Sequence, residues 1–179
     1  RLRFGLQAVL MHDCPGTHTY KITAVDEAGR SSSATLTVSV GGASNAPRIE
    51  WIGHTLGVPY IVADDLECKI RVTAPEGIAG FTVEIISDVL TPSILEGVGI
   101  TSHLDLVNPG EYKDKIEGLG FPTGDAVYGK TLIDENTLGI SSTFMGLLQI
   151  TGKGVNEFRM TVTDAAGQSV VGRIILEVK

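Results

Sequence analysis

The sequence is poor in cysteine, in aromatic residues and in basic charge. Only two cysteines, Cys14 and Cys68, occur in 179 residues, and no spacing of cysteine and histidine resembles a zinc site. No apolar run approaches the roughly 18 residues that a membrane-spanning helix needs. The 14 basic residues are outnumbered by 21 acidic ones and form no cluster. We therefore expect no metal site, no membrane span and no nucleic-acid partner.

Catalytic motifs are also missing. Neither the G-x-S-x-G nucleophile pattern nor the H-E-x-x-H zinc pattern occurs, and the four histidines have no acidic, serine or cysteine partner at a motif spacing. Acidic pairs of the kind found in glycosidases and calcium sites do occur, but solvated turns account for them better. These acids are Asp64, Asp65, Asp114, Asp134 and Glu135. We expect no catalysis by this chain and no cofactor.

Residues 124–131, GDAVYGKT, match the G-x-x-x-x-G-K-T pattern of a nucleotide-binding P-loop. A P-loop lies between a buried strand and a helix, and its backbone amides hold phosphate. The preceding residues 121–123 are no buried strand, and residues 132–138 contain several poor helix formers. We interpret the match as accidental, in a loop that leads into a strand.

Two segments, residues 17–40 and 155–179, share one pattern. Each residue of the first lies 138 positions before its counterpart in the second, so that Tyr20 falls on Phe158. Both segments alternate apolar and polar residues, turn through an Asp-x-x-Gly sequence and alternate again, as a β-hairpin does. The sequence therefore predicts the same closing hairpin twice.

The hairpin sequences YKITAVDEAG and FRMTVTDAAG resemble the last two strands of bacterial immunoglobulin-like domains, such as the PKD-type and fibronectin-III-like modules of secreted and surface proteins. Residues from about 90 to 151 do not follow these modules. Through LDLVNPGEY and GLGFPTGDAVYGKT they resemble a domain of unknown function in surface lipoproteins of gut bacteria of the Bacteroides type. The two resemblances imply immunoglobulin-like domains at a bacterial cell surface.

The repeat divides the chain into an incomplete domain and a larger one. We expect residues 1–42 to be the C-terminal part of an immunoglobulin-like domain, 43–47 a linker, and 48–179 an immunoglobulin-like domain with short helical insertions at about 90–150. The expected fold class is mainly β, with tandem immunoglobulin-like antiparallel β-sandwiches. Because the chain opens on Arg1, we expect a fragment or a mature segment whose signal peptide or lipid anchor lies upstream.

Period-two alternation predicts strands in both domains. Residues 2–11 and the first hairpin make three strands with an uncovered apolar face, which we expect to dock on a second copy, on the second domain or on an upstream segment. In the second domain the predicted strands are residues 48–52, 66–73, 81–86 and 103–107. Short helices, each after a capping Thr, Asn or Ser, are predicted at residues 92–96, 109–117 and 143–148.

The two cysteines fall on opposite sides of the predicted boundary. Cys68 belongs to the apolar face of residues 66–73, where a cysteine acts as a small hydrophobic residue. A bridge to Cys14 is left open, but two free thiols are favoured.

Exposed aromatic rings are the side chains that stack on sugars. Tyr112, Phe121 and Tyr128 lie in the middle region near predicted turns, and they are the candidate ligand-binding residues. Each has a structural alternative: the Tyr112 ring can pack inward, Phe121 fits a buried position better, and Tyr128 alternates with Ala126 in a strand-like run. Trp51 is interpreted as a core residue, because immunoglobulin-like domains often bury a tryptophan.

Together these patterns favour a non-catalytic extracellular binding or spacer module of a bacterial surface protein, with a glycan or another protein as ligand. One alternative is a structural adhesin or fimbria-type subunit that assembles through strand edges. Another is an accessory domain of a polysaccharide-degrading enzyme. The expected location is the outer membrane surface or the periplasm, and a homo-oligomer formed through the incomplete first domain is left open.

Overall fold

The computed structural model of the chain describes residues 16–26, 28–40, 45–63 and 66–179. The chain divides into two compact units, Arg1–Ser44 and Asn45–Lys179. The division falls within the segment where the sequence predicts a linker. Cys14 and the predicted strand at residues 2–11 lie outside the described residues.

Both predicted hairpins are present, and they pair in the same register. In the first unit, β1 (Gly16–Val25) and β2 (Ser31–Val40) are antiparallel, with Gly16 opposite Val40. In the second unit, β10 (Gly154–Asp164) and β11 (Ser169–Val178) are antiparallel, with Gly154 opposite Val178. These pairs are separated by the same 138 positions as the sequence repeat, which confirms the prediction of a duplicated hairpin.

The two hairpin turns use the same backbone chemistry. The amide of Gly29 donates to the carbonyl of Asp26, and the amide of Gly167 donates to the carbonyl of Asp164. Each aspartate Oδ1 also accepts the amide four residues ahead, at 2.9 Å for Asp26 and 2.8 Å for Asp164. The two glycines adopt φ of +78° and +81°, which other residues reach only with strain.

The second carboxylate oxygen distinguishes the two turns. Oδ2 of Asp26 accepts Nε of Arg30 at 2.6 Å, and the hydrogen bonds from the Arg30 backbone and side chain lower the pKa of Asp26. Gln168 takes the place of Arg30 in the second turn. There Asp164 is buried, and its Oδ2 has no partner among the described residues. The copies thus share a backbone but not an environment.

The second unit contains two β-sheets. The larger has the strand order β4-β11-β10-β6-β7, in which β4 runs parallel to β11 and the other neighbours are antiparallel. In the smaller sheet, β3, β8 and β9 each pair with β5. The remaining strands are β3 (Arg48–Trp51), β4 (Pro59–Ile61), β5 (Cys68–Thr73), β6 (Ile78–Ser87), β7 (His103–Asp105), β8 (Leu132–Ile133) and β9 (Gly139–Ile140).

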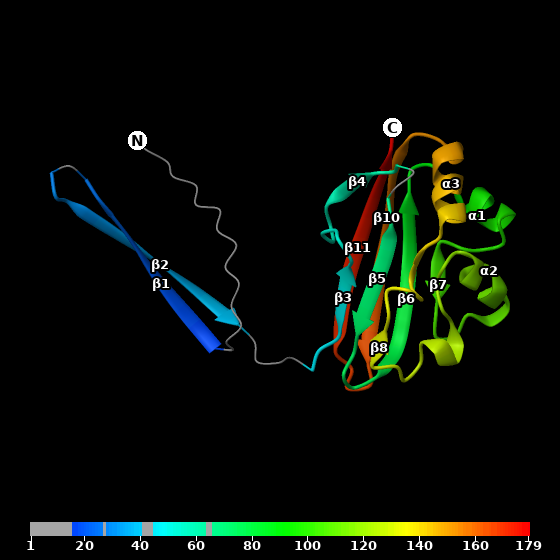
Figure 1. Cartoon of the computed structure of the whole chain (residues 1–179), viewed down its shortest axis with the longest axis horizontal. Coiled ribbons are helices and arrows are strands. Elements are labelled where there is room, and N and C mark those ends of the chain that lie inside the picture. The colour runs from blue at the N-terminus through cyan, green and yellow to red at the C-terminus, as the bar shows by residue number, and fades with distance from the viewer. Residues whose placement is uncertain (1–15, 27, 41–44, 64–65) are drawn as a thin grey trace. The chain divides into compact units, whose positions relative to one another are not determined.

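The apolar faces of both sheets contribute to one hydrophobic core. On β10 every second residue from Asn156 to Asp164 is buried, and on β5 Cys68, Ile70 and Val72 are buried. These apolar side chains belong to a single cluster, and Figure 1 shows β3, β5 and β8 as one layer and β6, β10 and β11 as another. The chain is therefore mainly β, as the sequence predicts.

The four strands predicted by alternation in the second domain are confirmed. Residues 48–52, 66–73, 81–86 and 103–107 contain or lie within β3, β5, β6 and β7. The sequence did not indicate β4 or β9, and it indicated β8 only as a strand that follows the loop at residues 124–131. β4 and β9 have three and two residues, which is too few for alternation to be recognised.

The helical insertion is also confirmed. Between β6 and β10 lie α1 (Pro92–Gly97), α2 (Lys113–Gly118) and α3 (Ser142–Thr151), with the 3-10 helices η1 (Gly110–Tyr112) and η2 (Gly124–Ala126). In Figure 1 the three α-helices gather on the side of the unit where β7 lies.

The capping predictions hold for only one of the three helices. Ser141 caps α3, because its Oγ accepts the amide of Phe144 at 3.3 Å. Thr91 precedes α1 but makes no side-chain cap. The segment after Asn108 begins as a 3-10 helix whose cap position is Pro109, and α2 starts only at Lys113.

Aromatic and polar contacts attach the insertion to β10. Phe144 of α3 packs edge-to-face on Phe158 of β10, with ring centroids 5.6 Å apart. At the point where the chain leaves β6, the Ser87 hydroxyl donates to Oδ1 of the buried Asn156 at 2.6 Å and accepts the amide of Leu90 at 2.7 Å. The insertion is therefore fixed at both ends.

Two valines of the second hairpin test which face of the sheet is covered. Val162 of β10 is fully buried, whereas Val171 of β11 is 56% exposed. We expect Val162→Ala to lower the free energy of unfolding by about 2 kcal/mol, because two buried methyl groups are lost and a cavity remains. Val171→Ala should cost less than about 1 kcal/mol.

Urea titration followed by the fluorescence of the single tryptophan measures both variants. That residue, Trp51, is buried in the second unit and reports on its unfolding alone. Equal losses for the two variants would contradict the assignment of the inner and outer faces.

Candidate binding groove

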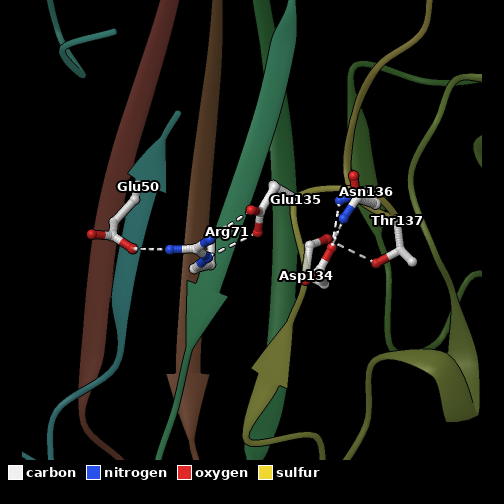
Figure 2. Close-up of polar contacts among 6 residues, drawn as sticks. All are labelled: Glu50, Arg71, Asp134, Glu135, Asn136 and Thr137. Atoms are coloured by element: carbon white, nitrogen blue, oxygen red, sulfur yellow. Dashed lines mark hydrogen bonds and ion pairs between the residues drawn. The ribbon is translucent and has the colours of Figure 1, made fainter. Parts of the chain in front are cut away.

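The neighbouring acids Asp134 and Glu135 have different partners. Figure 2 shows the Glu135 carboxylate on Arg71 of β5, with Nε–Oε2 at 2.9 Å and Nη2–Oε1 at 2.5 Å. Oδ1 of Asp134 instead accepts the backbone amide of Asn136 at 2.8 Å. The two carboxylates do not face each other across a space in which a substrate could lie.

Arg71 lies between two acids, Glu135 and Glu50. Its Nη1 is 3.9 Å from Oε2 of Glu50 on β3 (Figure 2). The hydrogen bonds from Arg71 lower the pKa of Glu135, and the same bonds raise the pKa of Arg71. Glu135 therefore stays ionised, with both oxygens occupied, and cannot donate a proton near neutral pH.

The other acids form no metal-holding cluster within the described part of the chain. Asp114 is exposed on α2, and Asp64 and Asp65 lie outside the described residues. Among residues 16–26, 28–40, 45–63 and 66–179, no group of three or more His, Cys, Asp or Glu side chains could hold a metal ion.

The glycine-rich segment 124–131 is not built to hold phosphate. The amides of Gly124 and of residues 126–130 each donate to a backbone carbonyl of the protein. The segment contains η2 and a turn and leads into β8, where a P-loop would lead into a helix. Because a P-loop needs these amides for its ligand, the match to the motif is an accident of sequence.

An open groove of about 970 Å³ lies on the second unit. Its walls are Ala63 and residues 66–69 before and at the start of β5, Glu117 of α2 with residues 120–122 after it, residues 135–142 around β9, and one face of α3. The α3 face contributes Met145, Gly146 and Gln149. This volume is within the range of small-molecule and oligosaccharide sites.

Two glycines allow three backbone segments to meet at the floor of the groove. β9 pairs with β5 at Cys68, while the amide of Gly139 donates to the carbonyl of Gly120 at 3.1 Å. A Cβ on Gly139 would lie 2.1 Å from the carbonyl oxygen of Cys68, and a Cβ on Gly120 would lie 2.6 Å from that of Gly139. No other residue type fits either position without moving the backbone.

The charged groups on the groove wall are largely paired with one another or with Arg71. Nζ of Lys69 is 2.8 Å from Oε2 of Glu67, and Glu135 is held by Arg71. Among the described residues of the wall Glu117 is the remaining acid, and its Oε1 accepts the Thr123 hydroxyl at 2.7 Å. The wall therefore carries a small excess of negative charge.

Neutral polar side chains supply the remaining hydrogen-bonding capacity. Thr137 and Asn136 lie on one wall, and Ser142 lies at the N-terminus of α3. Ser142 is exposed and has no side-chain hydrogen bond within the described residues. Cys68 is also part of the lining, but its side chain is buried, and burial raises the pKa of its thiol to about 12, so the thiol stays protonated. Cys68 is a free thiol, as the sequence favoured.

The three candidate aromatic residues do not form one site. Tyr112 is half-buried against the core, and Tyr128 is 61% exposed in the turn after η2. Of the three, Phe121 alone lines the groove, and with 2% exposure it offers no ring face to a sugar. The prediction that Tyr128 alternates with Ala126 in a strand is wrong, because Ala126 ends a 3-10 helix.

Three aromatic rings pack together at the connection between β3 and β4. Trp51 stacks on His54 at 4.5 Å between ring centroids and meets the edge of Tyr60 at 4.8 Å. Its indole Nε1 donates to the carbonyl of Glu67 at 3.3 Å. Trp51 is buried, which confirms its interpretation as a core residue and assigns the cluster a structural role.

The groove residues themselves were not predicted as a site. Ser141 was recognised as a helix cap and Cys68 as an inward-facing residue, but nothing in the sequence links them to residues 117–122. One available signal was Gly139, an isolated glycine beside a short apolar run, which marks a close approach of backbones.

The sequence of this chain matches no protein-family model and no curated protein. Of the helices in the described residues, none has the length and apolar composition to cross a lipid bilayer.

Gly139 and Gly146 form a matched pair for testing the floor of the groove. We expect Gly139→Ala to lower the free energy of unfolding by about 3 kcal/mol, because the new methyl group meets the Cys68 carbonyl. A methyl group on Gly146 would have no atom outside its own helix backbone within 4 Å, so Gly146→Ala should stabilise α3 by about 0.5–1 kcal/mol. Urea titration measures the free energy of unfolding of both variants. Equal changes in the two would disprove the close backbone contact at Gly139.

The ion pair between Arg71 and Glu135 makes the stability depend on pH. The pKa of Glu135 is lower in the folded state than its usual 4.5, so its contribution is complete above the unfolded pKa and is lost as the pH falls through the folded pKa. Glu135→Gln should therefore lower Tm at pH 7, and the difference from the wild type should vanish in acid.

Glu50→Gln is the control for this experiment. Glu50 lies 3.9 Å from the same guanidinium and is more exposed, so its removal should leave Tm almost unchanged. A difference for Glu135→Gln that persists below the folded pKa would show a cause other than the ion pair.

Proposed function

We propose that this chain is a non-catalytic binding module of a bacterial surface protein and that the groove beside β9 and α3 is its binding site. The observation that carries the proposal is the groove itself. It is built from the inserted middle region and the start of β5, and it combines space for a ligand with neutral hydrogen-bonding groups. The ionised, fully engaged Glu135 and the protonated Cys68 favour binding over catalysis.

The strand connectivity supports an immunoglobulin-like assignment for the second unit. In such domains the last two strands and a middle strand share one sheet, and the first two strands belong to the other. Here β11, β10 and β6 are neighbours in the larger sheet, while β3 and β5 are neighbours in the smaller one. Immunoglobulin-like domains are common in secreted and surface proteins, which motivates the extracellular location that we propose.

A structural role in assembly is the second candidate. In the described part of the first unit, β1 and β2 each have ten residues and pair with each other alone. Unpaired strand edges are templates for pairing with another chain. Under this alternative the chain forms concentration-dependent oligomers in analytical ultracentrifugation. A substitution that fills the groove should then leave this oligomerisation unchanged.

Blocking the groove tests the binding function. Gly146 faces the groove and has free space around it, so Gly146→Leu should fill part of the groove without disturbing the fold. Gly97→Leu is the matched control, because Gly97 is another helical glycine with free space but lies on α1 outside the groove. The full chain is immobilised and exposed to neutral, acidic and basic polysaccharides and to a random peptide library.

We expect at least one member of this panel to bind the wild type and Gly97→Leu, and to bind Gly146→Leu about 10-fold more weakly or not at all. Biolayer interferometry measures the affinities. The proposal is wrong if no member binds with Kd below about 1 mM, or if Gly146→Leu binds as tightly as the wild type.

A further inference from the structure

We infer that the groove takes an uncharged, hydroxyl-rich ligand, namely a neutral oligosaccharide. This inference rests on the proposed binding function and adds the chemical class of the ligand. It follows from the charge of the wall, from the pairing of β9 and from the groups that are left for hydrogen bonding.

The wall disfavours an anionic ligand. Lys69 is the one basic side chain that lines the groove, and Glu67 already pairs with it at 2.8 Å. Glu117 adds a carboxylate with no opposite charge to offset it among the contacts of the described residues. An acidic ligand would therefore meet excess negative charge and lose its hydration without gaining an ion pair.

The wall also offers a cationic ligand few carboxylates that are not already paired. Glu67 and Glu135 are bound to Lys69 and Arg71, so a cation would have to displace these partners. Glu117 is the remaining acid, and one of its oxygens is engaged by Thr123 at 2.7 Å. One partly engaged carboxylate is a weak basis for recognising a charged ligand in an open, hydrated groove.

A peptide has no strand edge to pair with here. β9 is bonded to β5 on one side, and on the other the amides of Gly139 and Ser141 donate to the carbonyls of Gly120 and Leu119 at 3.1 Å and 2.9 Å. Both edges of β9 are thus occupied, which prevents the addition of a peptide strand. The large apolar side chains of the floor, such as Phe121 and Leu138, are buried and form no open pocket for a peptide side chain.

Hydroxyl and amide groups are what the groove presents. Ser142 has a free hydroxyl, the Thr137 hydroxyl donates to the Asp134 carbonyl at 2.9 Å and can still accept, and the Asn136 amide keeps spare capacity beyond its contact with Asp134. These groups match the alternating donors and acceptors of sugar hydroxyls. Because the groove has no exposed aromatic face, binding depends on hydrogen bonds, and we expect it to be weak.

Hexasaccharides of matched length test the inference directly. Isothermal titration calorimetry compares neutral gluco-, xylo- and manno-hexaoses with acidic hexagalacturonate and with basic hexaglucosamine, on the full chain at about 50 and about 500 mM NaCl. We expect a neutral hexasaccharide to bind most tightly. Its Kd should change by less than about 2-fold between the two salt concentrations, because no ion pair is formed.

Two variants test whether the neutral hexasaccharide contacts Ser142 in the groove. Ser142→Ala should weaken the binding of the neutral hexasaccharide roughly 2- to 10-fold, since one neutral hydrogen bond is lost and no structural partner is disturbed. Ser93→Ala is the matched control: Ser93 is an exposed serine in the first turn of α1 outside the groove, and its loss should leave that Kd within about 2-fold of the wild type.

The outcomes separate this inference from the proposed function. If an acidic or a basic hexasaccharide binds most tightly and its affinity falls steeply with salt, the ligand class is wrong while the binding function stands. The same holds if only peptides bind and Gly146→Leu abolishes their binding. If nothing in either panel binds, or if binding ignores Gly146→Leu, the binding function itself fails and the inference fails with it.

Discussion

The second unit depends on the alternation of buried and exposed side chains along β10. This strand hydrogen-bonds to β6 on one edge and to β11 on the other, and its buried residues share one core with the smaller sheet. Phe158, on the same face, also contacts Phe144 of α3. A register shift of one residue would turn this whole set toward solvent, so the hydrophobic effect holds the two sheets and α3 in one arrangement.

The inserted region is held by a different constraint, the close approach of three backbone segments at the floor of the groove. Gly139 lies against Cys68 of β5 and bonds to Gly120 beyond α2, and a side chain on either glycine would separate the segments. The groove is a consequence of this contact. The segments that converge on β9 leave a hollow between α3, the start of β5 and residues 117–122, while their own backbone groups are satisfied.

The duplicated hairpin shows which features are determined by neighbouring residues and which are determined by tertiary packing. Both copies have the same register and the same Asp-x-x-Gly turn, because alternation and turn residues act over a few neighbouring positions. Their surroundings differ: Asp26 is exposed and bound to Arg30, whereas Asp164 is buried with an oxygen that has no partner among the described residues. Equivalent backbones therefore do not imply equivalent packing, since the environment comes from segments distant in the sequence.

By itself the sequence determined the two hairpins, the longer strands of the second unit, the inward position of Cys68, the buried Trp51 and the cap at Ser141, because each rests on a local period or a local hydrogen bond. The tertiary structure alone decided the rest. β4 and β9 exist through pairing rather than through their own few residues, and Tyr128 lies in a turn where a strand-like run was expected. The groove joins residues from three separated stretches, and Glu135 and Gly139 find their partners in segments far away along the chain, at separations over which no local pattern acts.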